Sequence, residues 1–207
     1  MTPDRIAELL SPFLGKEALS PGQIAAVETH LALLLKWNAK INLTAVREPE
    51  QIVTRHFGES FFAARNLIAT NNQTTAIDIG SGAGFPGLPL KIWAPDLKLT
   101  MVEANQRKAT FLHELVRSLG IFGVEVISMR AEEVATKADL VTLRAVEKFS
   151  KILPLSRTLV NPNGRLAILI SGQQIQAATT LVPNLRWNDP IKVPLSADRA
   201  LLVGNAP

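Results

Sequence analysis

The chain has 207 residues, of which 47% are hydrophobic and 19% charged, with a formal net charge of +4 and a pI of about 9.6. This length suits one domain of ordinary size with a substantial core, and the basic balance mildly favours a polyanionic partner. The lack of cysteine excludes disulfides, thiolate metal sites and cysteine nucleophiles, and no apolar run approaches the roughly 18 residues of a membrane span.

The first part of the chain, residues 1–72, is predicted to be helical. Apolar residues recur at helical spacing after Ser20, which stands before a proline and is typical of a helix start. A second helix is expected over residues 49–67. The polar residues 71–73 then mark a boundary with a domain over residues 73–207.

Beyond this boundary, strands alternate with helices, a pattern that predicts an α/β fold with a mostly parallel, Rossmann-like sheet and helices on both faces. Strands are expected over residues 75–79, 98–103, 124–128, 138–143 and 164–170, and helices over residues 86–93, 105–119, 147–159 and 172–182. Residues 184–193 and 199–204 are expected to form a closing hairpin. Ligands of such folds bind over the carboxyl ends of the strands.

The first expected strand ends in a glycine-dense turn, which reads Asp78-Ile79-Gly80-Ser81-Gly82-Ala83-Gly84-Phe85-Pro86-Gly87. Glycine adopts positive φ without steric cost and lacks the Cβ that would hold a ligand away. Three glycines at alternate positions, Gly80, Gly82 and Gly84, therefore predict a cofactor that lies on the main chain. The carboxylate of Asp78 is expected to face that cofactor.

A second acidic residue, Glu103, ends the next apolar run, about 19 residues after Gly84. A carboxylate at the tip of the second strand can accept hydrogen bonds from both hydroxyls of a ribose. The turn and Glu103 together predict a site for a nucleoside cofactor.

Two nucleoside cofactors fit this pattern. The spacing Gly82-x-Gly84-x-x-Gly87 also matches the dinucleotide fingerprint, so a NAD-dependent oxidoreductase is one alternative. Asp78 would repel a pyrophosphate but attract the sulfonium and ammonium groups of S-adenosylmethionine, which favours a class I methyltransferase. The second alternative is an RNA-binding module in which the cofactor loop is vestigial.

The later strand ends supply further candidates. After the third strand, Ala131 and Glu132 are expected to meet the adenine, although Glu132 could instead belong to a solvated first helical turn. After the fourth strand, Arg144 offers a planar donor fork for a carboxylate, a phosphate or a guanine edge. The alternative for Arg144 is a structural pairing with Glu103 or Glu132.

Four basic residues are candidates for RNA binding, with solvated helix-face charges as the alternative reading: Arg107, Lys108, Lys148 and Lys151. His30 and His56 are expected to pack or to form hydrogen bonds rather than to act as ligands or bases. The His113-Glu114 pair lacks the second histidine of a zinc motif, so no metal site is expected.

With these residues in view, the chain resembles the small-subunit ribosomal RNA guanine-N7 methyltransferases, also called the glucose-inhibited division protein B family. The matching segments are Lys36-Trp37-Asn38, Asn42-Leu43-Thr44, Arg55-His56 with Ser60, Asp78 through Pro89, Arg107 with Phe111-Leu112, Ala131-Glu132-Glu133, Arg144-Ala145 and Gly172-Gln173. Two positions depart from the family pattern: Glu59 stands where the family usually has aspartate, and Ser171 where it commonly has lysine.

The resemblance implies a class I S-adenosylmethionine-dependent methyltransferase with an N-terminal helical extension. It also implies methyl transfer to N7 of a guanine in 16S ribosomal RNA, either free or within the small ribosomal subunit. By the same resemblance, Gly80, Phe85, Ala131, Glu132 and Arg144 correspond to positions that contact the cofactor, and Glu103 to the acid that binds the ribose. A monomer in the cytoplasm, with no membrane partner, is expected.

Overall fold

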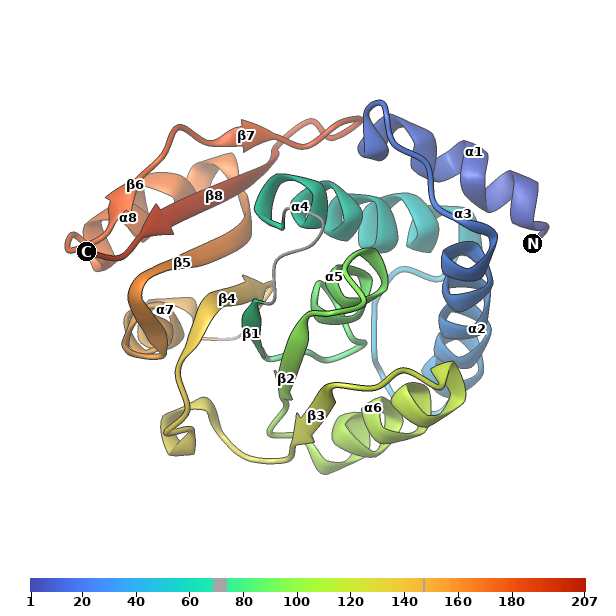
Figure 1. The fold of residues 1–207 in the computed structure, drawn as a ribbon, viewed down its shortest axis with the longest axis horizontal. Helices are drawn as coiled ribbons and strands as arrows, with labels where there is room; N and C mark the ends of the chain where they lie inside the picture. The colour runs from blue at the N-terminus through green and yellow to red at the C-terminus, as the bar shows by residue number, and fades with distance from the viewer. Residues whose placement is uncertain (69–73, 147) are drawn as a thin grey trace.

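The computed structural model describes residues 1–68, 74–146 and 148–207, and the strands of this part form one twisted sheet (Figure 1). The order along the sheet is β3-β2-β1-β4-β5-β8-β6, and β7 pairs with β8. The strands are β1 (Thr75–Ile79), β2 (Lys98–Val102), β3 (Val124–Ile127), β4 (Ala138–Arg144), β5 (Val160–Ser171), β6 (Arg186–Trp187), β7 (Ile191–Lys192) and β8 (Arg199–Asn205). The first five strands are parallel, as predicted.

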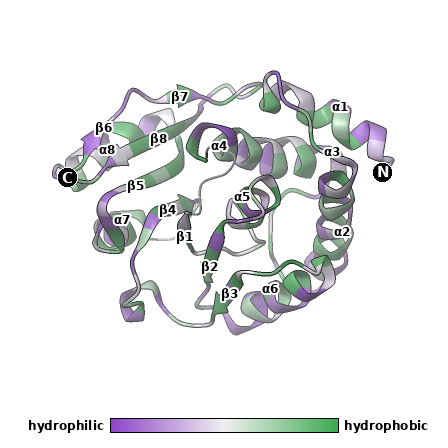
Figure 2. Ribbon diagram, in the orientation of Figure 1, coloured by the Kyte–Doolittle hydropathy of each residue, from purple (hydrophilic) through white to green (hydrophobic). Residues whose placement is uncertain are grey.

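The last strand, β8, runs antiparallel between β5 and β6. The expected closing hairpin is therefore confirmed, since both β6 and β7 pair with β8. Figure 2 shows β8 and the later part of β5, residues 166–170, coloured largely as hydrophobic, in keeping with strand segments that are buried on both faces.

Helices connect the parallel strands, and most of them match the expected ranges. They are α5 (Gly87–Trp93), α6 (Gln106–Leu119), α7 (Phe149–Thr158), α8 (Ile175–Leu181) and the 3-10 turns η2 (Ala131–Glu133) and η3 (Gly172–Gln174). The start of α6 is set by Asn105, whose side chain accepts hydrogen bonds from two backbone N–H groups, and its end by Gly120 at φ 60°. These local signals explain why the sequence pattern located α6 well.

The N-terminal region comprises α1 (Pro3–Leu14), α2 (Pro21–Asn38), α3 (Pro49–Ile52), the π-helix η1 (Val53–Gly58) and α4 (Glu59–Leu67). Ser20 caps α2 through a reciprocal capping box with Gln23, which confirms the predicted start. The helix predicted over residues 49–67 is helical throughout, but its middle turn is the π-helix η1. The first helix, α1, was not singled out in the sequence, although Thr2 caps it.

Each face of the sheet has its own hydrophobic core. One core joins the apolar faces of the N-terminal helices to α5, α6 and one sheet face, and the other packs α7 and α8 on the opposite face. In Figure 1, α1, α2 and α3 accordingly lie at the far side of the molecule from β6 and α8. The predicted boundary at residues 71–73 lies outside the described residues, so the division into two regions stays a prediction.

No helix in the described ranges is long and apolar enough to cross a membrane. The helices instead bury their apolar faces against the sheet or against one another, as those of a globular α/β fold do.

Gly58 lets α1 pack closely on η1, and its replacement is predicted to destabilise the fold. A Cβ built on Gly58 would lie 2.6 Å from two ring carbons of Phe13, which is fully enclosed in the core. We expect Gly58→Ala to lower the free energy of unfolding by about 1–3 kcal/mol through overpacking. The control is Gly22→Ala in α2, whose Cβ would have only the Ser20 hydroxyl at 4.0 Å. Urea denaturation of both variants measures the difference, and equal stability of the two would contradict this account.

Candidate functional site

The glycine turn after β1 presents bare main chain at the carboxyl end of the sheet. Gly80, Gly82 and Gly84 have φ values of 69°, 53° and 88°, a region that favours glycine. A Cβ on Gly82 would have only the Gly80 carbonyl oxygen nearby, at 3.6 Å, whereas a Cβ on Gly84 would lie 2.9 Å from Leu88. Gly82 therefore leaves free space on one side of the loop, which we call its open side. Gly84 faces Leu88 and His30 on the opposite side, the protein side, where close packing requires a glycine.

Asp78 organises this loop from beneath. Its fully buried carboxylate accepts hydrogen bonds from the Thr142 hydroxyl (2.8 Å) and the Gly87 N–H (3.2 Å), and Ser81 Oγ donates to the Asp78 carbonyl oxygen (2.9 Å). Burial raises the pKa of Asp78 to about 6, although the hydrogen bonds oppose this. We expected the carboxylate to face a cofactor. In the structure it binds the underside of the loop, because the chain folds back until Gly87 reaches it.

Glu103, at the end of β2, lies beside the open side of the loop. One carboxylate oxygen accepts from the Gly82 N–H (2.9 Å) and the other from the Asn105 N–H (2.8 Å), and the residue is 8% exposed. Each carboxylate oxygen has a second lone pair, so these bonds leave acceptor capacity for ribose hydroxyls. The structure thus brings together Glu103 and Gly82, as the sequence predicted.

His30 of α2 supports the loop from behind. Its Nε2 lies 2.8 Å from the Ala83 carbonyl oxygen, and since a carbonyl only accepts, Nε2 carries the proton. The ring stacks on Phe85 with centroids 4.7 Å apart and planes 13° apart. Burial lowers the pKa of His30 to about 4, so the imidazole is neutral at pH 7. His30 was expected to pack or hydrogen-bond, but its partner 53 residues away gave no signal in the sequence.

Asn38 and the Asn42-Leu43-Thr44 segment, which carried part of the family resemblance, are linked to the glycine loop through His56. Asn38 Oδ1 accepts from the N–H groups of Leu43 (2.9 Å) and Thr44 (3.0 Å), and its Nδ2 donates to the Thr44 carbonyl (3.1 Å). Thr44 Oγ1 lies 2.7 Å from His56 Nε2, and the His56 ring is 5.2 Å from that of Phe85. Phe85 is 6% exposed and so contributes to the inner side of the loop.

Arg144, at the end of β4, belongs to a buried charge cluster. Its Nη2 donates to Glu59 Oε2 (3.0 Å) and to the Arg55 carbonyl (2.6 Å), while Arg199 Nε lies 3.5 Å from the same Glu59 oxygen. Its partner is therefore Glu59 rather than Glu103 or Glu132. Burial lowers the pKa of Arg144 to about 10, although Glu59 opposes the shift. Two guanidinium groups thus share one carboxylate, and Arg144 Nε is buried with no hydrogen-bond partner in the described part of the chain.

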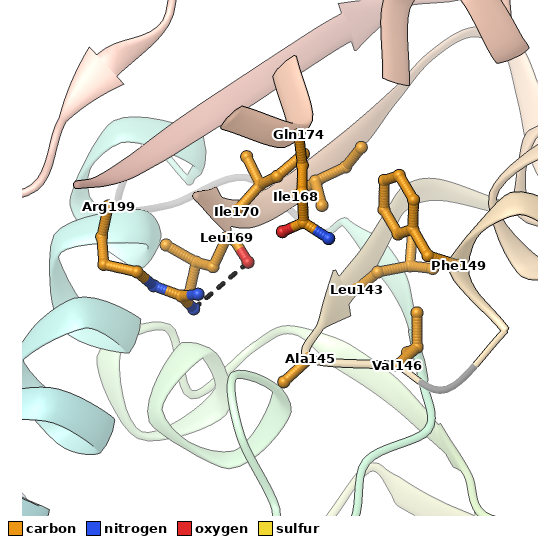
Figure 3. Close-up of a pocket in the computed structure, with 9 residues that line it drawn as sticks. All are labelled: Leu143, Ala145, Val146, Phe149, Ile168, Leu169, Ile170, Gln174 and Arg199. Carbon is orange, nitrogen blue, oxygen red and sulfur yellow. Dashed lines mark hydrogen bonds between the residues drawn. The ribbon is translucent and has the colours of Figure 1, made fainter. Parts of the chain in front are cut away.

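A small cavity of about 40 Å³ lies beside this cluster, at the carboxyl ends of β4 and β5 (Figure 3). It is lined by Leu143, Ala145, Val146, Phe149, Ile168, Leu169, Ile170, Gln174 and Arg199. Arg199 closes one side, where its Nη2 donates to the Leu169 carbonyl at 3.3 Å. This volume suits a few water molecules, so a nucleobase would enter only if lining side chains moved.

The remaining candidates surround the same edge of the sheet. Ala131 is buried at the start of η2, and the Glu132 carboxylate lies 2.6 Å from Lys151 Nζ, which lowers the pKa of Glu132. Arg107 and Lys108 lie in the first turn of α6, after β2, and Lys148 stands just before α7, after β4. Within the described residues these three side chains form no ion pair, whereas Lys151 is held by Glu132.

Comparison with known proteins gave matches over most of the chain. A family model described as rRNA small subunit methyltransferase G matches residues 23–181. The ribosomal RNA small subunit methyltransferase G of Xanthomonas campestris pv. campestris (strain B100) is 34% identical over 206 residues, covering 97% of this chain and 95% of that protein. Its namesake from Lactococcus lactis subsp. lactis (strain IL1403) is 36% identical over 179 residues, covering 84% and 74%.

Solved structures show the same fold at low sequence identity. The magnesium protoporphyrin IX methyltransferase from Synechocystis PCC 6803 with bound SAM aligns with a TM-score of 0.67 and 11% identity, covering 86% of this chain and 97% of that one. A ribosomal protein L11 methylase from Lactobacillus delbrueckii subsp. bulgaricus aligns with a TM-score of 0.63 and 13% identity, covering 74% and 80%. The chain therefore has the fold of class I methyltransferases.

Acidification from pH 7 to pH 5 is predicted to destabilise the protein through the buried His30 and the partly buried His56. Burial lowers the pKa of His30 to about 4 and of His56 to about 3, against about 6.5 in an unfolded chain. Below pH 6.5 the unfolded chain therefore binds protons that the folded chain does not, which lowers stability by on the order of 2 kcal/mol per histidine at pH 5. Asp78, with its raised pKa of about 6, acts in the opposite direction by on the order of 1 kcal/mol.

Urea denaturation at both pH values tests this effect. His30→Gln removes one titrating group and should show a smaller loss of stability between pH 7 and pH 5 than the unsubstituted protein. The control is His113→Gln on the exposed side of α6, which should keep the full loss. An unchanged loss in His30→Gln would show that His30 does not titrate as described.

Proposed function

The chain belongs to the rRNA small subunit methyltransferase G family, and we propose that it transfers a methyl group to N7 of a guanine in 16S ribosomal RNA. It is an S-adenosylmethionine-dependent rRNA methyltransferase with the class I fold. One observation supports placing the cofactor at the glycine loop. The Glu103 carboxylate is hydrogen-bonded to the N–H of Gly82, so an acceptor for ribose hydroxyls stands beside the bare main chain.

The sheet order does not support the oxidoreductase alternative. Dinucleotide-binding folds have the strand order 3-2-1-4-5-6, whereas β8 here runs antiparallel between β5 and β6. The alternative of a vestigial cofactor loop has no support in the site either, because Glu103 and the open face of Gly82 are both in place.

We propose that the cofactor contacts lie at the carboxyl ends of the first four strands. The main chain at Gly80 and Gly82 would lie against the cofactor, and Glu103 would accept hydrogen bonds from its ribose. Ala131 and Glu132, after β3, would meet the adenine. Arg144, after β4, would face the junction between the methionine part of the cofactor and the incoming base. Asp78, Gly84 and Phe85 would contribute from within the loop, by fixing its shape.

The chemistry explains why the site needs no general base. S-adenosylmethionine, when bound, supplies an electrophilic methyl group on a sulfonium. Guanine N7 holds an in-plane lone pair and has no proton to lose, so the protein has to orient N7 in line with the methyl–sulfur bond. Glu103 and the glycine loop would hold one reactant, while Arg144 offers donors to the guanine O6 or to a carboxylate.

Mass spectrometry of ribosomal RNA tests the substrate directly. We expect one 7-methylguanine of 16S ribosomal RNA to be lost in cells that lack the gene and to return when the gene is restored. Purified protein should then methylate ribosomal RNA from the deficient cells. If every modified guanine persists in the deficient cells, the proposed substrate is wrong.

Glu103→Ala is predicted to weaken binding of S-adenosylhomocysteine by about 1–3 kcal/mol, because two ribose hydroxyls lose a charged acceptor. Glu103→Gln, which keeps the shape but not the charge, should fall between this variant and the unsubstituted protein. Glu17→Ala, at an exposed position between α1 and α2, is the control. Isothermal calorimetry gives the affinities, and unchanged binding by Glu103→Ala would refute the ribose role.

We further propose that the RNA lies along the carboxyl edge of the sheet. Arg107 and Lys148 are exposed there without ion-pair partners in the described ranges, and Lys108 lies beside them in part-buried form. In the cluster behind them, Arg144 and Arg199 share the single carboxylate of Glu59, which leaves positive charge in excess. Both features favour a polyanion at this edge.

The salt dependence of RNA binding tests this surface. Each phosphate contact releases counterions, so we expect Arg107→Ala with Lys148→Ala to reduce the slope of log affinity against log salt by about 1–2. The matched control is Lys98→Ala with Lys137→Ala, two exposed lysines at the amino edge of the sheet. Equal slopes for the two double variants would place the RNA elsewhere.

The oligomeric state, cellular location and RNA partner of the protein are also proposed. We propose that the protein works as a monomer in the cytoplasm, on 16S ribosomal RNA or the small ribosomal subunit. Sedimentation of the purified protein, alone, with 16S ribosomal RNA and with small subunits, would test the oligomeric state and the RNA partner, since a dimer or a failure to bind either RNA form would contradict them.

A further inference from the structure

We propose that His30 is a positioning residue for methyl transfer, because its Nε2–H fixes the Ala83 carbonyl and thereby the shape of the cofactor loop. The inference rests on the proposed function, since it assigns a role within the same cofactor site. It concerns a residue of the N-terminal helices that would touch neither the cofactor nor the RNA.

The loop is shaped to receive this side chain. His30 is fully buried, with Phe85 stacked on its ring at 4.7 Å and Phe57 edge-on at 4.8 Å. A Cβ on Gly84 would lie 3.3 Å from His30 Cε1 and 3.5 Å from Nε2. The glycine at position 84 therefore admits the imidazole from the protein side, as Gly82 admits a ligand from the open side.

The hydrogen bond to Ala83 is the polar anchor of the ring. Nε2 lies 2.8 Å from the carbonyl oxygen, and Nδ1 is buried with no hydrogen-bond partner in the described part of the chain. A hydrogen bond in such dry, aromatic surroundings is electrostatically stronger than one in water. The neutral ring has a single N–H, and this proton is directed to the loop.

The peptide group between Ala83 and Gly84 is held at both ends, because the Gly84 N–H donates to the Ser81 carbonyl at 2.6 Å and the Ala83 carbonyl accepts from His30 at 2.8 Å. In the described residues, side chains hold this turn at four points: Asp78 at the Gly87 N–H, Glu103 at the Gly82 N–H, Ser81 at the Asp78 carbonyl, and His30 at the Ala83 carbonyl. Of these four, His30 is the one that acts on a carbonyl from outside the turn. Without His30, this peptide group would keep the hydrogen bond of its N–H but lose that of its carbonyl, and the neighbouring Gly82 main chain would be held less firmly in the shape that the cofactor requires.

Two near-isosteric variants isolate the hydrogen bond. His30→Gln retains a side-chain N–H donor, whereas His30→Met has a similar length and no donor, and both lose the stacked ring. His30→Phe keeps the stacking and lacks the donor. The control is His113→Gln on the exposed side of α6. For each protein we would measure the Kd for S-adenosylhomocysteine by calorimetry, the Tm, and the KM values for S-adenosylmethionine and for RNA.

We expect His30→Met and His30→Phe to bind S-adenosylhomocysteine about fivefold more weakly than the unsubstituted protein, as the loss of one hydrogen bond of about 1 kcal/mol predicts. His30→Gln should stay within about twofold. The KM for S-adenosylmethionine should rise while the KM for RNA stays unchanged, a separation that general destabilisation would not produce.

Two results would overturn the inference. The first is equal affinity of the Gln, Met and Phe variants, and the second is a change in Tm with no change in the cofactor Kd. If instead the unsubstituted protein bound no S-adenosylhomocysteine, the proposed function itself would fail. The two failures can therefore be told apart.

Discussion

The carboxylate of Asp78 is the interaction on which the site depends. Burial of a carboxylate costs free energy unless hydrogen bonds compensate for the lost water. In the fully buried Asp78, one carboxylate oxygen accepts from the Thr142 hydroxyl of β4, and the other accepts from the Gly87 N–H at the start of α5. One side chain thus joins two strands and a helix around the glycine loop. With the loop held from below by Asp78 and from behind by His30, the main chain on its open side stays free for a ligand.

The cluster of Glu59, Arg144 and Arg199 contains more positive than negative charge. Glu59 and Arg144 come from segments 85 residues apart, and their side chains are 6% and 9% exposed. The attraction between them is therefore offset by the free energy of removing both charges from water. Arg199 adds a second cation to the same carboxylate. A cluster in which two guanidinium groups share one carboxylate adds little to stability. It does provide hydrogen-bond donors at the end of β4 for an anionic or carbonyl-bearing group.

The sequence predicted those features that local rules determine. Strand and helix alternation gave the sheet, Ser20 marked the start of α2, and the acid at the end of β2 was placed beside the glycine loop. The partners of buried side chains could not be read in the same way. His30 and Ala83 are 53 residues apart, and the partner of Arg144 was sought at Glu103 or Glu132 instead of Glu59. These contacts depend on how the helices pack on the sheet.

The position of β8 has a consequence for how the site is assembled during synthesis. This strand is the last in chain order, yet it lies inside the sheet and pairs with β5 on one side and β6 on the other. Until the ribosome has released it, β5 has an unpaired edge that could associate with other chains. Arg199 stands at the first residue of β8, so the cationic cluster around Glu59 is completed only by the final strand. The ribosome therefore synthesises the glycine loop and the end of β4 before it adds Arg199, the second cation of this cluster.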